Sequence, residues 1–219
     1  MARLMAAVLI SGRGTNLQAL IDDCARSDAP AGIALVLSNV AGAAGLARAE
    51  AAGIATVTVD HKGFPSREAF EDAISERLDA AGAEIVCLAG FMRLLTASFV
   101  ERWRDRLINI HPSLLPSYRG LDTHARAIAD GVRFAGCTVH FVRAEMDAGP
   151  IIVQAAVPVL ADDTADSLAA RVLRAEHRCY PLALRLIAAG RVRVDGARVI
   201  VEGAGAPGAI LLNPDDGRG

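Results

Sequence analysis

Residues 107–116 read LINIHPSLLP, an apolar strand pattern that ends in an amide, an imidazole and two prolines. Successive side chains of a strand point to opposite faces, so Asn109 and His111 share one face, and Ile108 and Ile110 share the other. Pro112 favours an extended His111 and cannot donate a ladder hydrogen bond, which places the polar pair where the strand stops. In open α/β sheets, ligands bind at that edge. The pair alone fits either catalysis or the capping of a turn.

The composition indicates one domain with a sizeable core. The chain has 219 residues, of which 53% are apolar, and a formal net charge of −2. This charge gives no electrostatic sign of nucleic-acid binding and favours small-molecule partners. The four cysteines lie far apart and none forms a C-x-x-C pair, so we expect no zinc or redox-dithiol site and a cytoplasmic location. No apolar run reaches the roughly 20 residues that span a bilayer, so we expect no membrane insertion.

Short apolar runs alternate with longer amphipathic segments along the chain. This alternation predicts an α/β fold, Rossmann-like, with a mostly parallel twisted sheet and helices on both faces. Besides the central stretch, the expected strands cover residues 4–11, 33–38, 54–59, 84–88, 136–142 and 151–157. The expected helices cover residues 16–26, 43–52, 123–130 and 167–189, and Ser66 caps a further one.

The C-terminal part of the chain carries two further signals. Pro181 predicts a kink in the last helix. An Asp-Gly step within residues 192–201 predicts a C-terminal β-hairpin. Earlier in the chain, Asp122 or Thr123 is expected to cap the helix that follows it. We expect a single domain over residues 1–203 and a disordered tail over residues 204–219, which are rich in Gly, Pro and Asp.

A glycine loop, residues 11–16 with the sequence SGRGTN, follows the first expected strand. It lacks the Gly-Lys-Ser/Thr ending of a P-loop and the third glycine of the dinucleotide fingerprint. The free N–H groups and positive end of the following helix favour a single phosphate. The alternative is that Gly12 and Gly14 only form the turn and that Thr15 or Asn16 only caps the helix.

Other polar residues also have a structural and a functional interpretation. Asp147 precedes Ala-Gly-Pro and on its own is more typical of a turn. Residues 89–95, AGFMRLL, leave the strand 84–88 and form either ordinary core or an apolar slot for a flat ligand. Arg67 and Glu176 lie in expected helices, where such residues are usually solvated.

The motif Asn109-x-His111-Pro112-Ser113-Leu114-Leu115-Pro116, followed by Gly120-Leu121-Asp122-Thr123-His124, resembles that of the folate-dependent formyltransferases. The resemblance extends over about residues 4–181 and is nearest to the branch that formylates glycinamide ribonucleotide in purine synthesis. It implies transfer of a formyl group from 10-formyltetrahydrofolate, the co-substrate, to the primary amine of the ribonucleotide. No metal is implied.

The resemblance also implies three groups of site residues. The catalytic group is Asn109, His111 and Asp147. The ribonucleotide-binding group is Gly14, Thr15, Asn16, Leu173 and Glu176. The folate-binding group is Arg67, Met92, Arg93, Leu94, Leu95, Asn109, Arg143, Ala144, Glu145, Met146 and Asp147.

The implied chemistry gives each catalytic residue a role. Asn109 donates an amide hydrogen to a tetrahedral oxyanion, and His111 is a second donor when it is protonated. Asp147 favours the imidazolium and relays a proton through water. Ser113 as a nucleophile, His124 beside the site and His140 as structural support are left open.

Three other functions stay open at this stage. Transfer RNA formylating relatives carry a further C-terminal domain, and formyltetrahydrofolate hydrolases carry an N-terminal one; we expect neither here. A phosphate-ester binding module is the non-catalytic alternative. We expect small-molecule substrates, no nucleic-acid or membrane partner, and a monomer or weak homodimer.

Overall fold

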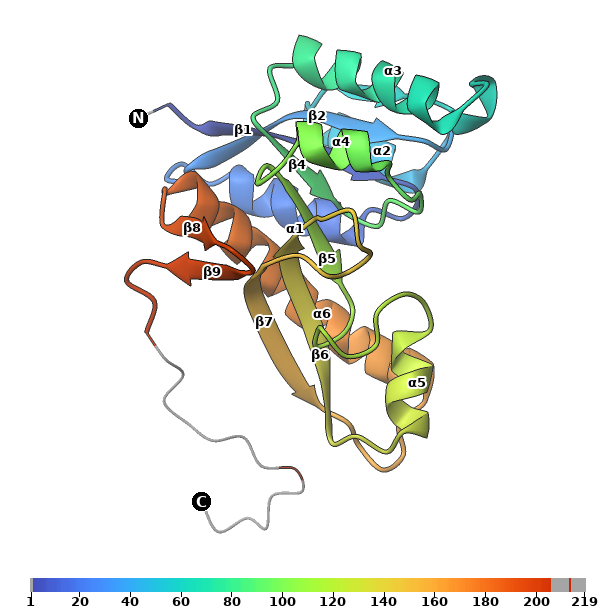
Figure 1. Cartoon of the computed structure of the whole chain (residues 1–219), viewed down its shortest axis with the longest axis vertical. Helices are drawn as coiled ribbons and strands as arrows, with labels where there is room; N and C mark the ends of the chain where they lie inside the picture. Colours follow the sequence, from blue (N-terminus) through green and yellow to red (C-terminus); the bar gives the residue numbers. More distant parts are fainter. Residues whose placement is uncertain (1, 206–212, 214–219) are drawn as a thin grey trace.

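Seven runs of the sequence form one sheet in the computed structural model, which describes residues 2–205 and 213 (Figure 1). The strands are β1 (Leu4–Ile10), β2 (Ala31–Ser38), β3 (Thr56–Thr58), β4 (Ile85–Leu88), β5 (Leu107–His111), β6 (Phe134–Phe141) and β7 (Ile151–Pro158). Their order in the sheet is β3-β2-β1-β4-β5-β6-β7. The first five run parallel, whereas β6 pairs antiparallel with both β5 and β7. The predicted mostly parallel sheet is therefore confirmed.

Helices cover both faces of the sheet, as predicted. They are α1 (Thr15–Cys24), α2 (Ala44–Ala51), α3 (Arg67–Ala80), α4 (Ala97–Arg102), α5 (Thr123–Ala129) and α6 (Ala165–Ala188), with a short 3-10 helix at His61–Gly63. Val8 and Ile10 pack in one core cluster with residues of α1, α2 and α6, while Leu9 packs in a second cluster with α3 and α4. The alternation along β1 therefore divides the core into two layers.

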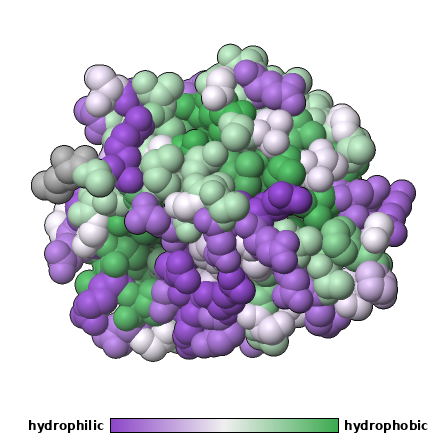
Figure 2. Space-filling view, turned by 90° about the horizontal axis from the view of Figure 1, so that it is seen from above, coloured by the Kyte–Doolittle hydropathy of each residue, from purple (hydrophilic) through white to green (hydrophobic). Residues whose placement is uncertain are grey.

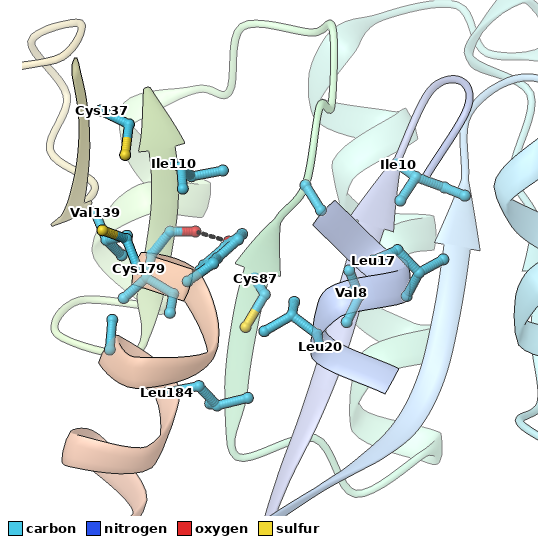
Figure 3. Packing of buried hydrophobic residues seen from close by; sticks show 14 of the residues in the cluster. Val8, Ile10, Leu17, Leu20, Cys87, Ile110, Cys137, Val139, Cys179 and Leu184 are labelled. Carbon is cyan, nitrogen blue, oxygen red and sulfur yellow. Dashed lines mark hydrogen bonds between the residues drawn. The ribbon is translucent and has the colours of Figure 1, made fainter. Parts of the chain in front are cut away.

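The first core layer lies between the sheet and the helices α1 and α6. In Figure 3, Leu17 and Leu20 of α1 and Leu184 of α6 lie close to the strand residues Val8 and Cys87. Tyr180 of α6 is fully buried in this layer, and its hydroxyl donates to the carbonyl oxygens of Leu88 (3.0 Å) and Ile108 (3.2 Å). Tyr180 therefore attaches α6 to β4 and to β5, the strand that ends in the central motif.

Several local predictions are confirmed, and others need correction. The Ser66 hydroxyl accepts from the N–H of Ala69 and caps α3, as expected. Asp122 is the residue before α5, but it has a φ of 55° and its side chain makes no cap hydrogen bond. The structure also contains α4, which the sequence pattern does not predict. Thr96 caps this helix by accepting from the N–H of Phe99.

The C-terminal hairpin is also confirmed, with a shifted turn. β8 (Val192–Asp195) pairs antiparallel with β9 (Arg198–Val201), and Asp195 lies opposite Arg198. The two central turn residues are therefore Gly196 and Ala197 rather than Asp195 and Gly196. Gly196 has the positive φ, 61°, that the first of these positions needs. In Figure 1 the hairpin lies beside β7. The predicted tail falls mostly on residues 206–212 and 214–219, which lie outside the described residues.

Apolar residues also reach the surface. Figure 2 shows green apolar patches between hydrophilic residues on one face of the molecule. Among the described residues, large and strongly exposed apolar side chains are Leu121 (78%), Met92 (68%), Leu94 (62%) and Met146 (53%). All four belong to loops that follow or precede sheet strands. In the part of the chain that the structure describes, no helix has the length and apolar character needed to cross a membrane.

Candidate functional site

The polar pair of the central motif lies at the carboxyl end of β5. Ile108 and Ile110 point into the first core layer, so the alternation of the strand turns Asn109 and His111 to the opposite face. Asn109 is half-buried and lies opposite Leu88 of β4, while His111 is the last residue of the strand and is buried. The local geometry of this pair is therefore as the sequence pattern predicts.

Both ring nitrogens of His111 face protein groups. Nε2 lies 2.9 Å from the carbonyl oxygen of Tyr118, which can only accept, so Nε2 carries a hydrogen. Nδ1 lies 3.5 Å from the Oδ2 atom of Asp147. Nothing joins His111 to Ser113, whose buried hydroxyl donates to the carbonyl of Ser117 at 2.6 Å. Ser113 therefore holds the loop after β5 and is not a nucleophile activated by His111.

Asp147 comes from the loop between β6 and β7 and reaches back to the end of β5. It adopts a positive φ of 52°, and its Oδ2 atom accepts from the N–H of Gly120 at 2.9 Å. Only 11% of its side chain is exposed. Gly149 allows this loop to close, because a Cβ at that position would lie 1.6 Å from the carbonyl oxygen of Phe141. The structure thus brings Asp147 to His111, which local turn statistics could not foresee.

His140 is a fourth polar residue of this cluster. It lies directly opposite Asn109 in the β5–β6 register, and its Nε2 atom is 3.4 Å from Asn109 Nδ2 and 3.9 Å from Asp147 Oδ1. Burial lowers the pKa of its imidazole, despite the nearby Asp147 carboxylate. The sequence alone leaves open which face of the strand the His140 side chain occupies. The alternation of β6 contains the signal, because Cys137, Val139 and Phe141 face the core.

A second polar pair lies at the start of α1. Gly14 is the residue before the helix, with a φ of 69°, and no side chain caps the helix there. Thr15 and Asn16 form the first turn, and Asn16 Nδ2 donates to Glu176 Oε2 of α6 at 2.7 Å. Neither Thr15 nor Asn16 acts as the N-cap. The alternative prediction, that one of these two residues only caps the helix, is therefore wrong.

Glu176 is the α6 member of this second pair. It is buried, and burial raises the pKa of its carboxyl group, while the hydrogen bond from Asn16 and the charge of His111 oppose that rise. Leu173 lies one helical turn earlier on α6 and is half-buried.

Apart from Asn109 of β5, the predicted folate-binding residues fall into three places. Met92, Arg93 and Leu94 are exposed in the loop after β4, and Leu95 is half-buried. The N–H of Met92 donates to the Ser11 hydroxyl at 2.8 Å, which fixes this loop to the end of β1.

The second place is the loop that carries Asp147. Arg143 pairs with Asp105, and Glu145 accepts from Arg119 at 2.6 Å, while Ala144 and Met146 are exposed. The third place is Arg67, which is exposed in the first turn of α3. Among the described residues, no hydrogen bond or ion pair joins the Arg67 side chain to the cluster around His111.

A known protein family matches most of this chain. Its residues 4–184 match the family model described as formyl transferase. The chain belongs to the formyl transferase family.

Relatives within the formyl transferase family cover nearly all of this chain. A phosphoribosylglycinamide formyltransferase of Escherichia coli (strain K12) is 46% identical over 206 residues, which are 91% of this chain and 97% of that protein. A crystal structure of glycinamide ribonucleotide transformylase 1 from Symbiobacterium toebii superposes with a TM-score of 0.89 at 50% identity, over 91% of this chain and 94% of the other.

Longer proteins also contain a region of the formyl transferase family similar to this chain. The trifunctional purine biosynthetic protein adenosine-3 of Gallus gallus is 51% identical over 195 residues, covering 89% of this chain but 19% of that protein. The chain therefore spans about a fifth of the length of this trifunctional relative.

Two further observations concern the surroundings of His111 and the possible metal ligands. His124 is half-buried, and burial followed by the charge of His111 lowers the pKa of its imidazole. Its Nε2 atom is buried without a hydrogen-bond partner among the described residues. Within the same part of the chain, no group of three or more His, Cys, Asp or Glu side chains could hold a metal ion.

Proposed function

We propose that this chain transfers a formyl group from 10-formyltetrahydrofolate to the primary amine of glycinamide ribonucleotide, a step of purine biosynthesis. The single observation that carries the proposal is the meeting of Asn109, His111 and Asp147 at the end of β5. The hydrogen bond between Asn16 and Glu176 at the start of α1 adds a second polar group to the proposed site. The names of the relatives from Escherichia coli and Symbiobacterium toebii support the choice of the ribonucleotide as acceptor.

The ribonucleotide end of the proposed site is the start of α1. The backbone N–H groups of the first turn and the positive end of the helix favour the phosphate, with Gly14, Thr15 and Asn16 around it. Glu176 is the proposed acceptor for sugar hydroxyl groups, since its carboxylate can accept several hydrogen bonds. Leu173 is proposed as an apolar wall beside the ribonucleotide.

The folate end of the proposed site is formed by two loops. The exposed apolar side chains of Met92, Leu94 and Met146 provide the apolar surface that a flat ring needs, with backbone groups of residues 92–95 for its polar edge. Arg93, Arg143 and Arg67 are the proposed contacts for an acidic tail, with Arg143 also paired to Asp105. The remaining proposed folate contacts are Leu95, Ala144 and Glu145.

The proposed reaction forms one carbon–nitrogen bond and breaks another. The amine of the ribonucleotide attacks the formyl carbon, the bond from that carbon to the folate nitrogen breaks, and one proton moves from the amine to the folate nitrogen. Asn109 donates an N–H to the oxygen that becomes negative, an interaction commonly worth about 3 to 4 kcal/mol. Asp147 is the proposed acceptor of the amine proton, directly or through water.

His111 stabilises this arrangement through charge. When protonated, its Nδ1–H faces Asp147 while Nε2–H stays on the Tyr118 carbonyl. One of these two contacts has to open before His111 can donate directly to a substrate oxygen. We therefore assign the oxyanion contact first to Asn109, and to His111 the electrostatic support of Asp147.

The test mixes the purified chain with 10-formyltetrahydrofolate and follows the folate absorbance with glycinamide ribonucleotide present or omitted. Loss of the formyl group only with the amine present supports the proposal. Loss without the amine indicates a formyltetrahydrofolate hydrolase. No loss in either mixture rejects catalysis and leaves a phosphate-ester binding module, which phosphate-dependent binding of the ribonucleotide would then identify.

A further inference from the structure

His140 and Asn109 form a cross-strand pair that neither the predicted catalytic group nor the family match explains. They face each other in the antiparallel β5–β6 register, so their side chains lie on the same face of the sheet. His140 is 2% exposed, and its Nε2 atom lies 3.4 Å from Asn109 Nδ2. The imidazole therefore forms the buried wall behind the Asn109 amide.

The contacts of the second ring nitrogen determine which tautomer His140 adopts. Nδ1 lies 3.0 Å from the carbonyl oxygen of Phe141, an atom that can only accept a hydrogen bond. Nδ1 must therefore carry the hydrogen. Burial lowers the pKa of His140, which keeps the ring neutral near pH 7 and leaves a lone pair on Nε2.

This lone pair discriminates between the two orientations of the Asn109 amide. An asparagine amide can turn over with little change of shape, exchanging its oxygen and its NH2 group. With NH2 toward His140, one N–H donates to the Nε2 lone pair. With the oxygen toward His140, two electron-rich atoms face each other in a buried site, which is unfavourable.

We propose that His140 is a positioning residue, which uses the Nε2 lone pair to hold the NH2 group of Asn109 in the orientation needed for formyl transfer. One amide hydrogen is bound by His140, and the second is left free for a substrate oxygen. The contact between the second amide hydrogen and a substrate oxygen rests on the proposed function. The tautomer of His140 and the orientation of the Asn109 amide do not depend on it. Asp147 also faces Nε2, at 3.9 Å, and would compete for this nitrogen only if it were protonated.

The kinetic test compares His140→Leu, which removes the acceptor, with His140→Gln, whose side-chain oxygen can replace Nε2. We expect His140→Leu to lower kcat at least tenfold with little change in either KM, because a lost oxyanion donor costs about 10²- to 10³-fold. His140→Gln should recover a large part of kcat. Equal losses in both variants would overturn the role of the acceptor.

A double-mutant cycle separates positioning of Asn109 from a general structural effect. In an Asn109→Ala background there is no amide to orient, so His140→Leu should change kcat less than about twofold. The same loss in both backgrounds would show that His140 acts independently of Asn109 and would reject the proposal.

A nuclear magnetic resonance measurement on the wild-type chain tests the inference without activity. Nitrogen-15 spectra of the histidine rings should show His140 neutral, with the hydrogen on Nδ1, and a hydrogen-bonded side-chain NH2 pair for Asn109. A hydrogen on Nε2 would overturn the inference even if formyl transfer occurs. Absence of transfer by a wild-type chain with the expected spectra would instead reject the proposed function. The same spectra decide the matter if His140→Leu fails to fold.

Discussion

Asp147 is a carboxylate that the backbone places at the site. Its positive φ is uncommon for a residue other than glycine, and both of its oxygens face groups of the cluster. The N–H of Gly120 holds Oδ2, so the carboxylate keeps its place whether or not His111 is charged. The position of Asp147 therefore depends on neutral contacts, and its chemistry depends on its charge.

The variant Asp147→Asn separates these two properties. The amide oxygen can still accept from Gly120, so we expect the thermal unfolding midpoint to stay within a few degrees of the wild type. Turnover should fall about 10²- to 10⁴-fold, because the proton acceptor is lost. Single-turnover formyl transfer and calorimetry measure the two effects. Near-normal turnover would remove Asp147 from the mechanism.

Glu176 predicts a dependence of stability on pH. Its pKa is raised above the ordinary value of 4.5, chiefly by burial. Between 4.5 and the raised value the folded chain binds more protons than the unfolded chain, so the free energy of unfolding falls as pH rises through this window. Glu176→Gln removes the carboxyl group that titrates, and with it this dependence of stability on pH.

Glu176→Gln should therefore become more stable relative to the wild type as the pH increases from 4 toward 8. The change in the free energy of unfolding should be of the size that the raised pKa of one carboxyl group produces. Urea denaturation of both proteins at several pH values measures the difference. Glu76→Gln, at an exposed position of α3, is the control and should show a much smaller trend. A constant or shrinking difference for Glu176→Gln would contradict the expected sign.

At the scale of elements, the starts of α1 and α2 are in close contact. The N–H of Gly45 in α2 donates to the carbonyl of Gly12 at 3.0 Å, and a Cβ on Gly14 would lie 2.7 Å from the Gly45 Cα. Gly14 also needs its left-handed conformation. The proposed phosphate site thus depends on two glycines of neighbouring elements, one of which lies outside the loop itself.

Gly14→Ala should disturb this contact. The left-handed conformation costs an alanine about 1 to 2 kcal/mol, and the close backbone contact adds to it. We expect a lower thermal unfolding midpoint and a KM for the ribonucleotide raised about tenfold or more, with a smaller change in the KM for folate. Gly63→Ala, where a Cβ meets nothing within 4 Å, is the matched control. Equal KM values in both variants would argue against a phosphate at this loop.

Local sequence patterns predict some helices and strands of this fold and not others. The period-2 pattern and Pro112 correctly predict that β5 ends in a polar pair, because both are local constraints. α4 was missed because its six residues carry a single cap and little periodicity. The antiparallel direction of β6 is set by pairing between distant segments, so the approach of His140 to Asn109 and of Asp147 to His111 could not be derived from local patterns.

At the scale of the whole molecule, Tyr180 links the longest helix to the middle of the sheet. Its hydroxyl is the buried partner of the Leu88 and Ile108 carbonyls. Tyr180→Phe should lower the free energy of unfolding by about 1 to 3 kcal/mol, since it removes a buried donor. Urea denaturation measures this change. A variant as stable as the wild type would show that the hydroxyl adds nothing to the attachment of α6.

All four cysteines are free thiols buried in the first core layer, and Figure 3 labels three of them, Cys87, Cys137 and Cys179. A thiol reagent added to the native chain can therefore react only when part of the fold opens. Cys24, at the end of α1, should be modified through local fraying of that helix, and Cys87, in the central strand β4, only through opening of the sheet. The chain thus contains its own set of labels for separating partial from global opening, with no substitution needed to introduce them.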